Sequence, residues 1–406
     1  MREIKIIHFA TYPVRQPLHG GQLRVAAIQK MLTNSGHEII HMATYPYFID
    51  SGGTSNEWDF IIPPDYFEWA QKHDLRPTDV DCSEFFLKSK VIYDKLVSQI
   101  QRTKPDVLVI EQAWLWPVIK KIRDENSNLR NLPLVCSSHN IESQLLKMVL
   151  EIDGVAHNKI ETIYFRAFHL ERDLILHSDV IIAVTEEDAN LFKQIKNQQV
   201  YICPNGIAQS APIKDFATWK SRYNNINFAF FIGSFYPPNS EGFMTMVGPH
   251  SAYLAPDMKV VVGGGVSNLI TYHKDYLRYK GLIDRSFDLL GILEAGHLSS
   301  LLTLAKAILL PITHGGGSNL KTAEAILTEK PIVATSKAFR GYEKYLALPQ
   351  IFIEDDPYCF KMKVQELLDS KKTITLSQEE RALIQNVLWE NTLSELPHII
   401  ERLAKE

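Results

Sequence analysis

Short apolar runs alternate with longer segments of helical spacing along most of the chain. Residues 4–9 (IKIIHF) predict a buried strand, and residues 22–35 repeat apolar side chains on one helical face before Gly36 ends the helix. A second strand is expected from residue 38. This strand, helix, strand order recurs in two successive series, which predicts two doubly wound, Rossmann-like α/β domains.

Further elements follow from the same pattern. In the first series we expect strands at 106–110, 133–137, 179–184 and 200–203, and helices at 85–104, 114–123 and 144–177 with an interruption near Asp153. In the second series we expect strands at 228–233, 259–262, 287–291, 307–310 and 331–334, and helices at 297–305, 320–327 and over most of 377–406. The N-terminal domain is thus predicted over 1–208, a polar linker over 209–227, and the C-terminal domain over 228–385. Residues 46–81 are irregular and aromatic-rich, typical either of a binding loop or of a segment packed on its own side chains.

Composition narrows the class of protein. With 406 residues, 45% hydrophobic content and a net charge of −4, the chain is typical of a soluble globular protein and lacks the basic field of a nucleic-acid-binding protein. The four cysteines are scattered, which favours a reducing cytoplasm over a disulfide framework or a zinc site. No apolar run reaches the roughly 18 residues that cross a bilayer.

The stretch 309–335 (LLPITHGGGSNLKTAEAILTEKPIVAT) carries the strongest chemical signal. Gly315, Gly316 and Gly317 form a loop after a strand, and Ser318 or Asn319 is a suitable N-cap for the next helix. A glycine loop at a helix N-terminus presents N–H groups and a positive dipole end to an anion. Lys321 and Glu324 are three residues apart and share a helical face, so a cation and a hydroxyl-accepting carboxylate lie beside that anion site. The combination predicts a site for a nucleotide or a nucleotide sugar.

Other candidate ligand-binding residues also come directly after predicted strands, at the edge of the sheet where ligands bind. Gly20 and Gly21 follow the first strand, where a helix-entry turn and a ligand site are equally plausible from the sequence. His139 and Glu142 follow the strand 133–137. The glycines at 263–265 do not complete a G-x-G-x-x-G motif because Asn268 stands at the third glycine position. The sequence therefore does not indicate a dinucleotide-binding enzyme that transfers hydride. Asp79 and Asp81 form an isolated D-x-D pair in a predicted loop, and we propose no metal.

In order and spacing, these motifs resemble a GT-B fold glycosyltransferase of the retaining, family-four-like kind. The resemblance rests on Gly20-Gly21, residues 138–140 (SHN), 179–185 (DVIIAVT), 204–206 (PNG), 233–235 (GSF) with Pro238-Asn239, 262–265 (VGGG) and 315–325 (GGGSNLKTAEA). It implies that the C-terminal domain binds a nucleotide-sugar donor, with UDP or GDP the favoured nucleotides and no separate cofactor, and that the N-terminal domain binds the acceptor. It also implies that the closing helix within 386–406 crosses back to the N-terminal domain and that a cleft between the domains is the active site.

The resemblance implies roles for individual residues. Glu324 would hold the ribose hydroxyls, Lys321 would neutralise phosphate, and His139 would lie near the transferred sugar. The remaining donor-side residues would be Gly233, Ser234, Asn239, Ile292, Gly316, Gly317, Ser318 and Asn319. Gly20, Gly21 and Glu142 would lie on the acceptor side.

The sequence departs from the family pattern at two places. The family glutamate eight residues before Glu324 is here Gly316, so a carboxylate contact to the donor sugar is missing or replaced. The arginine–lysine pair that often follows the second domain's first strand is replaced by residues 236–239 (YPPN). A nucleotide-sugar 2-epimerase of the same fold and a non-catalytic nucleotide-sugar-binding or partner-binding protein therefore remain alternatives.

The acceptor is expected to be a carbohydrate, a lipid-linked compound or a protein, and no carboxylate nucleophile for double displacement stands out. We therefore expect same-face attack with retention, without a metal ion. Trp114 and Trp116 beside Lys120, Lys121 and Arg123 leave open an aromatic–basic surface for an anionic membrane, although a solvated edge helix is favoured. The expected location is the cytoplasm, with contact to the inner face of the membrane left open.

Overall fold

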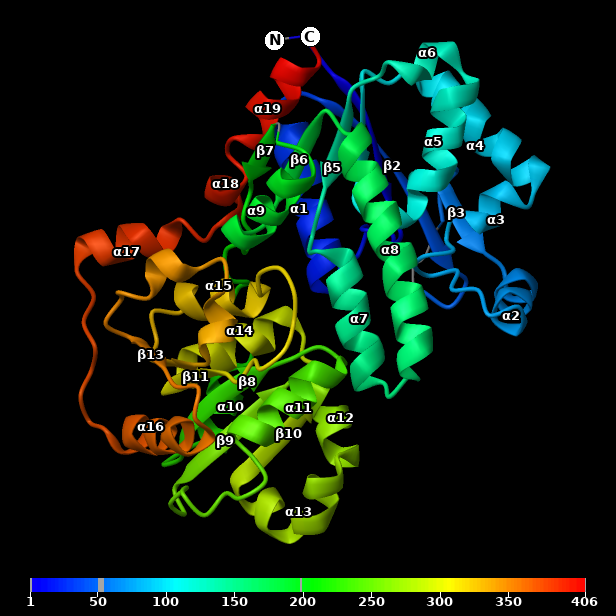
Figure 1. The fold of residues 1–406 in the computed structure, drawn as a ribbon. Helices are drawn as coiled ribbons and strands as arrows, with labels where there is room; N and C mark the ends of the chain where they lie inside the picture. The colour runs from blue at the N-terminus through cyan, green and yellow to red at the C-terminus, as the bar shows by residue number, and fades with distance from the viewer. Residues whose placement is uncertain (1, 50–54, 198, 406) are drawn as a thin grey trace. The chain divides into compact units, whose positions relative to one another are not determined.

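The computed structural model describes residues 2–49, 55–197 and 199–405. The chain forms two compact units, Met1–Pro204 with Thr392–Glu406 and Asn205–Asn391. Each unit contains one parallel β-sheet with helices on its faces, as the ribbon drawing shows (Figure 1). The predicted α/β class with two doubly wound domains is confirmed.

The first unit contains a seven-stranded sheet in the order β3-β2-β1-β4-β5-β6-β7. Its strands are β1 (Lys5–Ala10), β2 (Glu38–Pro46), β3 (Asp59–Ile62), β4 (Val107–Ile110), β5 (Leu134–Ser137), β6 (Val180–Ala183) and β7 (Val200–Ile202). Neighbouring strands are parallel throughout, with Ile6 opposite both Ile39 and Val107. The strand order reverses between β1 and β4, and in such sheets the loops after these two strands form the ligand crevice.

Helices cover both faces of this sheet. They are α1 (Gly20–Asn34), α2 (Pro64–Lys72), α3 (Glu84–Leu87), α4 (Lys90–Thr103), α5 (Trp116–Glu125), α6 (Ser127–Arg130), α7 (Glu142–Ile152), α8 (His157–His177), α9 (Glu186–Ile195) and α19 (Leu396–Leu403). Ile7, Leu108 and Ile181 point to the face that buries side chains of α4, α5, α8 and α9. Helix α19 packs against α1, so the C-terminal residues complete the first unit.

The second unit contains a six-stranded sheet in the order β10-β9-β8-β11-β12-β13. Its strands are β8 (Asn227–Ile232), β9 (Met258–Gly263), β10 (Phe287–Gly291), β11 (Ala307–Leu310), β12 (Ile332–Ala334) and β13 (Ile351–Ile353). Here the order reverses between β8 and β11. Continuous apolar runs such as FAFFI and AILL suit strands that are buried on both faces.

The helices of the second unit are α10 (Phe216–Arg222), α11 (Pro237–Met246), α12 (Val266–Tyr272), α13 (Lys274–Ser286), α14 (Ala295–Leu304), α15 (Leu320–Leu327), α16 (Pro357–Asp369), α17 (Gln378–Gln385) and α18 (Trp389–Thr392), the last of which ends at the boundary between the units. Alternate side chains of each strand point to opposite faces of the sheet, and each face has its own hydrophobic core. Phe230 and Ile308 pack with α14 and α15, whereas Phe231 and Leu309 pack with α11 and α16.

Three predicted segments differ in the structure. The region 46–81, expected to be irregular, contains β3 and α2 among its described residues, and residues 50–54 lie outside the description. The helix expected over 85–104 is divided into α3 and α4, and Ser89 caps α4 by accepting from the Ile92 N–H. The segment 209–227, expected to be a linker, contains α10, which packs against α14.

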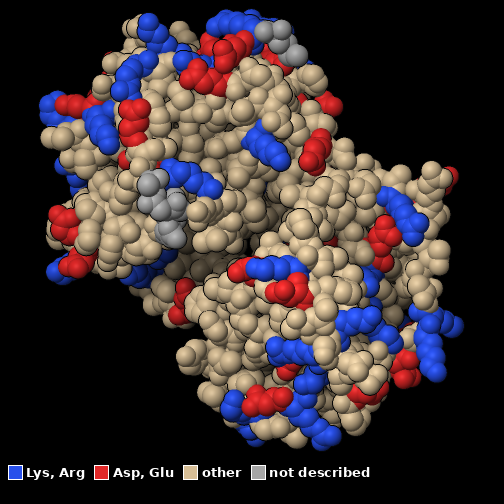
Figure 2. Space-filling model, turned by 180° about the vertical axis from the view of Figure 1, so that it is seen from behind, with Lys and Arg blue, Asp and Glu red and all other residues tan. Residues whose placement is uncertain are grey.

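The aromatic–basic surface considered near residue 114 does not form. Trp114 and Trp116 are 5% and 1% exposed, and the Trp116 indole donates to Asp173 at 2.7 Å. Lys120 pairs with the same carboxylate at 2.8 Å. Figure 2 shows cations and anions interspersed over the visible face of the molecule. Within the part of the chain that is described, none of the helices combines the length and apolar character needed to span a bilayer.

Candidate functional site

The glycine loop of the second unit lies between β11 and α15, at the carboxyl edge of the sheet. Helix α15 begins after Asn319, as the sequence predicted, although the Asn319 side chain makes no capping hydrogen bond. Gly315 and Gly317 have φ angles of 137° and 56°, which residues with a side chain rarely adopt. The glycines therefore allow the chain to turn sharply between the end of β11 and the helix.

The loop is held through its carbonyl oxygens. Arg340, which follows β12, donates from Nε to the Gly317 oxygen and from Nη1 to the Gly315 oxygen, the latter at 2.8 Å. Asn205 donates to the Ser318 oxygen at 3.1 Å. These contacts turn the carbonyl oxygens of Gly315, Gly317 and Ser318 toward protein donors and fix the backbone of the loop.

The amide groups of the same loop are free of protein acceptors. Within 2–49, 55–197 and 199–405, no acceptor is found for any backbone N–H of residues 315–321. These N–H groups belong to a positive-φ turn and to the first turn of a helix, the two backbone features that bind anions. The loop can therefore bind a phosphate through several amides at once.

Lys321 links this loop to the loop after β8. Its Nζ donates to Asn239 Oδ1 at 2.6 Å, and Asn239 Nδ2 donates to the Ser234 backbone oxygen at 3.1 Å and to its hydroxyl at 3.3 Å. Asn239 is 5% exposed and lies in the first turn of α11. The structure thus brings together Ser234, Asn239 and Lys321, which the sequence placed on the donor side.

Glu324 lies one turn after Lys321 on the same helix, and both side chains are half-buried. Burial raises the pKa of Glu324 to about 7, and the Lys321 charge opposes that rise. Burial also lowers the pKa of Lys321 to about 8, opposed by Glu324. The two groups therefore change charge close to neutral pH. A bound anion would raise the pKa of Lys321 and so favour the charged ammonium form of that residue.

Gly233 has a packing role. A Cβ at Gly233 would lie 2.9 Å from Val266 Cγ1, and a Cβ at Gly264 would lie 2.2 Å from the Gly233 oxygen. The Gly264 φ angle is 85°, and the Val266 N–H donates to that same oxygen at 3.0 Å. The glycines at 263–265 therefore let the loop after β9 pack against the loop after β8. Ile292 follows β10, and 84% of its surface is exposed.

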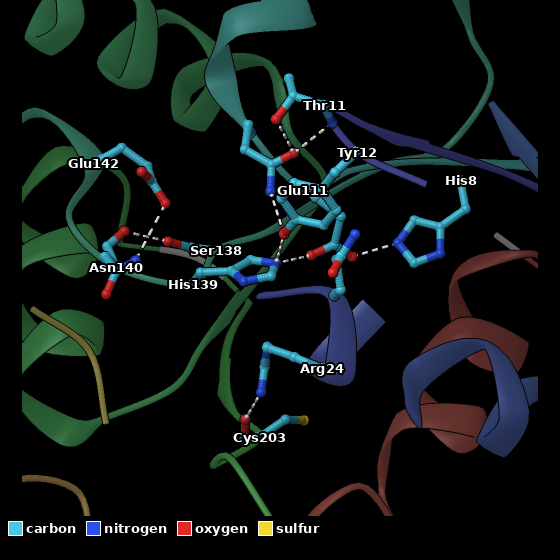
Figure 3. Close-up of polar contacts among 12 residues, drawn as sticks. His8, Thr11, Tyr12, Arg24, Glu111, Ser138, His139, Asn140, Glu142 and Cys203 are labelled. Carbon is cyan, nitrogen blue, oxygen red and sulfur yellow. Dashed lines mark hydrogen bonds and ion pairs between the residues drawn. The ribbon is translucent and has the colours of Figure 1, made fainter. Parts of the chain in front are cut away.

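The first unit has a polar cluster where its strand order reverses, and Glu111 lies at the centre (Figure 3). Glu111 directly follows β4 and is 2% exposed. Its Oε1 is hydrogen-bonded to Nε2 of His8 in β1, and its Oε2 lies 2.5 Å from Nε2 of His139 after β5. Burial alone would raise the pKa of Glu111, but the two histidines outweigh burial and hold that pKa well below its usual range. His139 is thus a buried partner of a carboxylate.

Gly20 and Gly21 form the first turn of α1, so the helix begins two residues earlier than predicted. His19 caps it, because its Nδ1 accepts from the Gln22 N–H at 3.4 Å. A Cβ at Gly21 would lie 2.7 Å from the Tyr12 hydroxyl. That hydroxyl accepts from Gln112 at 2.8 Å and lies 3.5 Å from His139 Nε2. Gly21 thus makes room for a tyrosine that belongs to the histidine cluster.

Glu142 lies at the start of α7, three residues after His139. Burial raises its pKa to about 8, and the nearby Glu171 carboxylate adds to the rise. Glu171 accepts hydrogen bonds from the Glu142 N–H at 2.7 Å and from the Ser143 hydroxyl at 2.7 Å, so it caps α7. Asn140 Nδ2 donates to Glu142 at 3.4 Å. Glu142 therefore holds its proton at neutral pH in the free protein.

Sequence reasoning missed three residues of these sites, His8, Glu111 and Arg340. Glu111 directly follows an apolar strand, and a histidine inside the apolar strand 4–9 required a buried partner, which was the available signal. Arg340 stands six residues after β12 with no motif around it, so its contact with the glycine loop could be seen only in the structure. In the described parts of the chain, no group of three or more His, Cys, Asp or Glu side chains is arranged so that it could hold a metal ion.

Two doubly wound parallel sheets in one chain form a fold of the GT-B type. The comparisons with known proteins confirm that resemblance. Residues 64–210 match the family model Glycosyltransferase Family 4. No curated protein matches the sequence.

Solved structures match over the whole chain. Sucrose-phosphate synthase from Thermosynechococcus elongatus superposes with a TM-score of 0.68 at 13% identity, over 99% of both chains. Anabaena HepE in complex with UDP and glucose gives 0.63 at 15% identity, over 100% of both chains. The catalytic domain of Arabidopsis thaliana starch synthase IV, bound to ADP and acarbose, gives 0.64 at 12% identity, over 100% of both chains. At these identities the comparison establishes the fold.

Proposed function

We propose that the protein is a glycosyltransferase that moves a sugar from a nucleoside-diphosphate sugar to an acceptor hydroxyl. The observation that carries the proposal is the run of acceptor-free amides over 315–321, which ends at Lys321, whose ammonium group is held by Asn239. Seven N–H groups and a cation suit a diphosphate, which carries several acceptor oxygens and negative charge. Structural neighbours solved in complex with UDP, UDP-glucose and ADP support a nucleotide donor.

The residues of the glycine loop and of the helix after it have distinct tasks in this proposal. The amides of Gly316, Gly317, Ser318 and Asn319 bind the diphosphate, and Lys321 adds charge from the position that Asn239 fixes. Glu324 accepts hydrogen bonds from the ribose hydroxyls once it is ionised. Gly316 supplies an amide where the family pattern has a carboxylate, so the donor sugar loses one acidic contact.

The chemical step breaks the bond between the anomeric carbon and the phosphate oxygen, and the electron pair goes to the leaving nucleoside diphosphate. The acceptor oxygen forms the new bond from the same face, and its proton passes to the leaving phosphate oxygen. Negative charge grows on the diphosphate in the transition state, where fixed amide dipoles and Lys321 stabilise it without reorganising. This step retains the anomeric configuration and requires no metal ion.

Release of nucleoside diphosphate from UDP-sugars and GDP-sugars tests the proposal. We expect release by the native protein, and a loss of roughly 100-fold in Lys321→Met and in Glu324→Gln, the scale of removing one stabilising group from a transition state. Lys330→Met is the matched control, because Lys330 lies just beyond the other end of α15 and donates to the Thr303 oxygen. Native rates in both site variants, or no release from any donor by the native protein, would refute the proposal.

A further inference from the structure

The hydrogen-bond network behind His139 fixes where the ring hydrogens lie. Gln29 Nε2 lies 3.3 Å from Nδ1 of His8 and 2.9 Å from Nδ1 of His41. An amide NH₂ group only donates, so both imidazole rings accept at Nδ1 and carry their hydrogen on Nε2. The Nε2–H of His41 donates to the Tyr12 oxygen at 3.1 Å, as this assignment requires. Burial, together with the neighbouring His8, lowers the pKa of His41 to about 4, which agrees with a neutral ring.

The position of the ring hydrogen on His8 determines which hydrogen bond Glu111 accepts from it. With its hydrogen on Nε2, His8 donates to Glu111 Oε1. An ionised carboxylate only accepts, so in the 2.5 Å contact between Glu111 Oε2 and His139 Nε2 the imidazole nitrogen is the donor. His139 therefore carries a hydrogen on Nε2 and presents Nδ1 as its other ring nitrogen. Within the described residues no protein group is hydrogen-bonded to that Nδ1.

We propose that Glu111 and His8 are positioning residues that hold His139 in the Nε2–H form, leaving Nδ1 to accept a hydrogen bond from a hydroxyl of the sugar substrate. This inference rests on the proposed function for its substrate class. The order of the network is Gln29, His8, Glu111, His139: Gln29 fixes the ring hydrogen of His8, His8 holds the Glu111 carboxylate, and Glu111 fixes the ring hydrogen of His139. The nitrogen that a histidine offers to a ligand is set by the bond that its other nitrogen makes.

A structural role alone would also explain a buried carboxylate between two histidines. The two roles differ in their effect on the ring. A structural Glu111 contributes to stability and leaves the tautomer of His139 without consequence, whereas a positioning Glu111 controls which nitrogen is free. The test must therefore read the hydrogen position at His139 directly.

Nitrogen-15 NMR of protein labelled in its histidines provides this reading, with His139→Gln used to assign the resonance. We expect a protonated Nε2 and an unprotonated Nδ1 at His139 in the native protein at pH 7.5. In Glu111→Gln the amide can donate to Nε2, so we expect a mixture of both tautomers. The matched control is Glu171→Gln, another buried carboxylate of the first unit, which should keep the native signal. A native Nδ1–H form overturns the proposal, and this outcome needs no variant to fold.

Steady-state kinetics then links the tautomer to turnover. We expect kcat to fall roughly 100-fold in Glu111→Gln, the scale of a misplaced reacting group. The donor KM should stay within about twofold, and Glu111→Asp should restore part of kcat. A mixed tautomer with native kcat overturns the positioning role. Because the NMR measurement uses no substrate, its failure is distinguishable from a failure of nucleotide-sugar transfer, which would appear as absent turnover in the native protein.

Discussion

Lys321 donates a hydrogen bond from Nζ to Asn239 Oδ1 at 2.6 Å, and this contact joins α15 to α11, the helices that follow β11 and β8. The asparagine is fixed in turn by its two hydrogen bonds to Ser234. A flexible ammonium group on the helix that follows the glycine loop is thereby held in one position before any ligand arrives. Holding a side chain in its binding position reduces the entropy that binding must remove.

Removing the asparagine should weaken nucleotide binding. We expect Asn239→Ala to lower the affinity for a nucleoside diphosphate about tenfold, since a hydrogen bond to a charged group contributes about 1.5–3 kcal/mol. Isothermal titration calorimetry measures this change. Ser240→Ala is the control, because Ser240 is on the same helix and donates to the Pro237 oxygen. Equal affinities of the two variants would show that Asn239 does not position the lysine.

Arg340 should be essential for the form of the glycine loop. A guanidinium group reaches the Gly315 and Gly317 oxygens together, whereas a lysine offers a single nitrogen. We expect Arg340→Lys to lower the free energy of unfolding by about 1–2 kcal/mol and to weaken nucleotide binding as well. Thermal denaturation with and without nucleotide measures both effects. Lys337→Ala, an exposed change in the same segment, should leave both quantities native. A native nucleotide affinity in Arg340→Lys would contradict this role.

Gly264 should tolerate no side chain. Alanine at this position combines a φ angle of 85° with a Cβ placed 2.2 Å from the Gly233 oxygen, so we expect a loss of several kcal/mol of stability. The control is Gly281→Ala in α13, where no neighbouring atom lies within 4 Å of the added Cβ. There we expect a gain of about 0.5–1 kcal/mol, because alanine is the better helix former. Urea denaturation compares the two, and similar stabilities would disprove the packing of these loops.

The free energy of unfolding should fall as the pH rises through the range in which Glu324 loses its proton. Burial raises the pKa of Glu324 to about 7, so the folded chain keeps a proton that the unfolded chain has released. The folded state is therefore favoured less as the pH rises from about 5 to about 8. Glu324→Gln removes this dependence, and the variant should gain stability relative to the native protein as the pH increases. A constant difference in the urea midpoint between the two proteins across this range would contradict the assigned pKa shift.

How far the sequence predicts this molecule depends on how local each signal is. The bounds of α15 were predicted to the residue, because glycines, a cap and an apolar stripe are all neighbours in the chain. The prediction that residues 46–81 are irregular was wrong. Strand β3 in this region is only four residues long, and its strand character comes from pairing with β2. Tertiary contacts decide such short elements, so their own sequence carries little information.

The same distinction applies to the site. Lys321 and Glu324 were predicted to share one face of a helix, and they do so in α15, because helical spacing alone decides this. The partners of His139 were missed, since Glu111 and His8 approach it only when β1, β4 and β5 align in the sheet. Trp114 and Trp116 were left open as surface residues for a related reason: their burial under α8 is a contact between distant segments.

The central claim is that the loop over 315–321 binds a nucleoside diphosphate. The direct measurement is the thermal midpoint of the native protein and of Glu324→Ala with UDP, GDP, ADP and CMP. A ligand at 100 times its Kd stabilises the folded state by about 2.7 kcal/mol, which shifts the midpoint by several degrees. We expect one of the diphosphates to raise the native midpoint and to have little effect on Glu324→Ala. No shift with any nucleotide, or equal shifts in both proteins, would contradict the account.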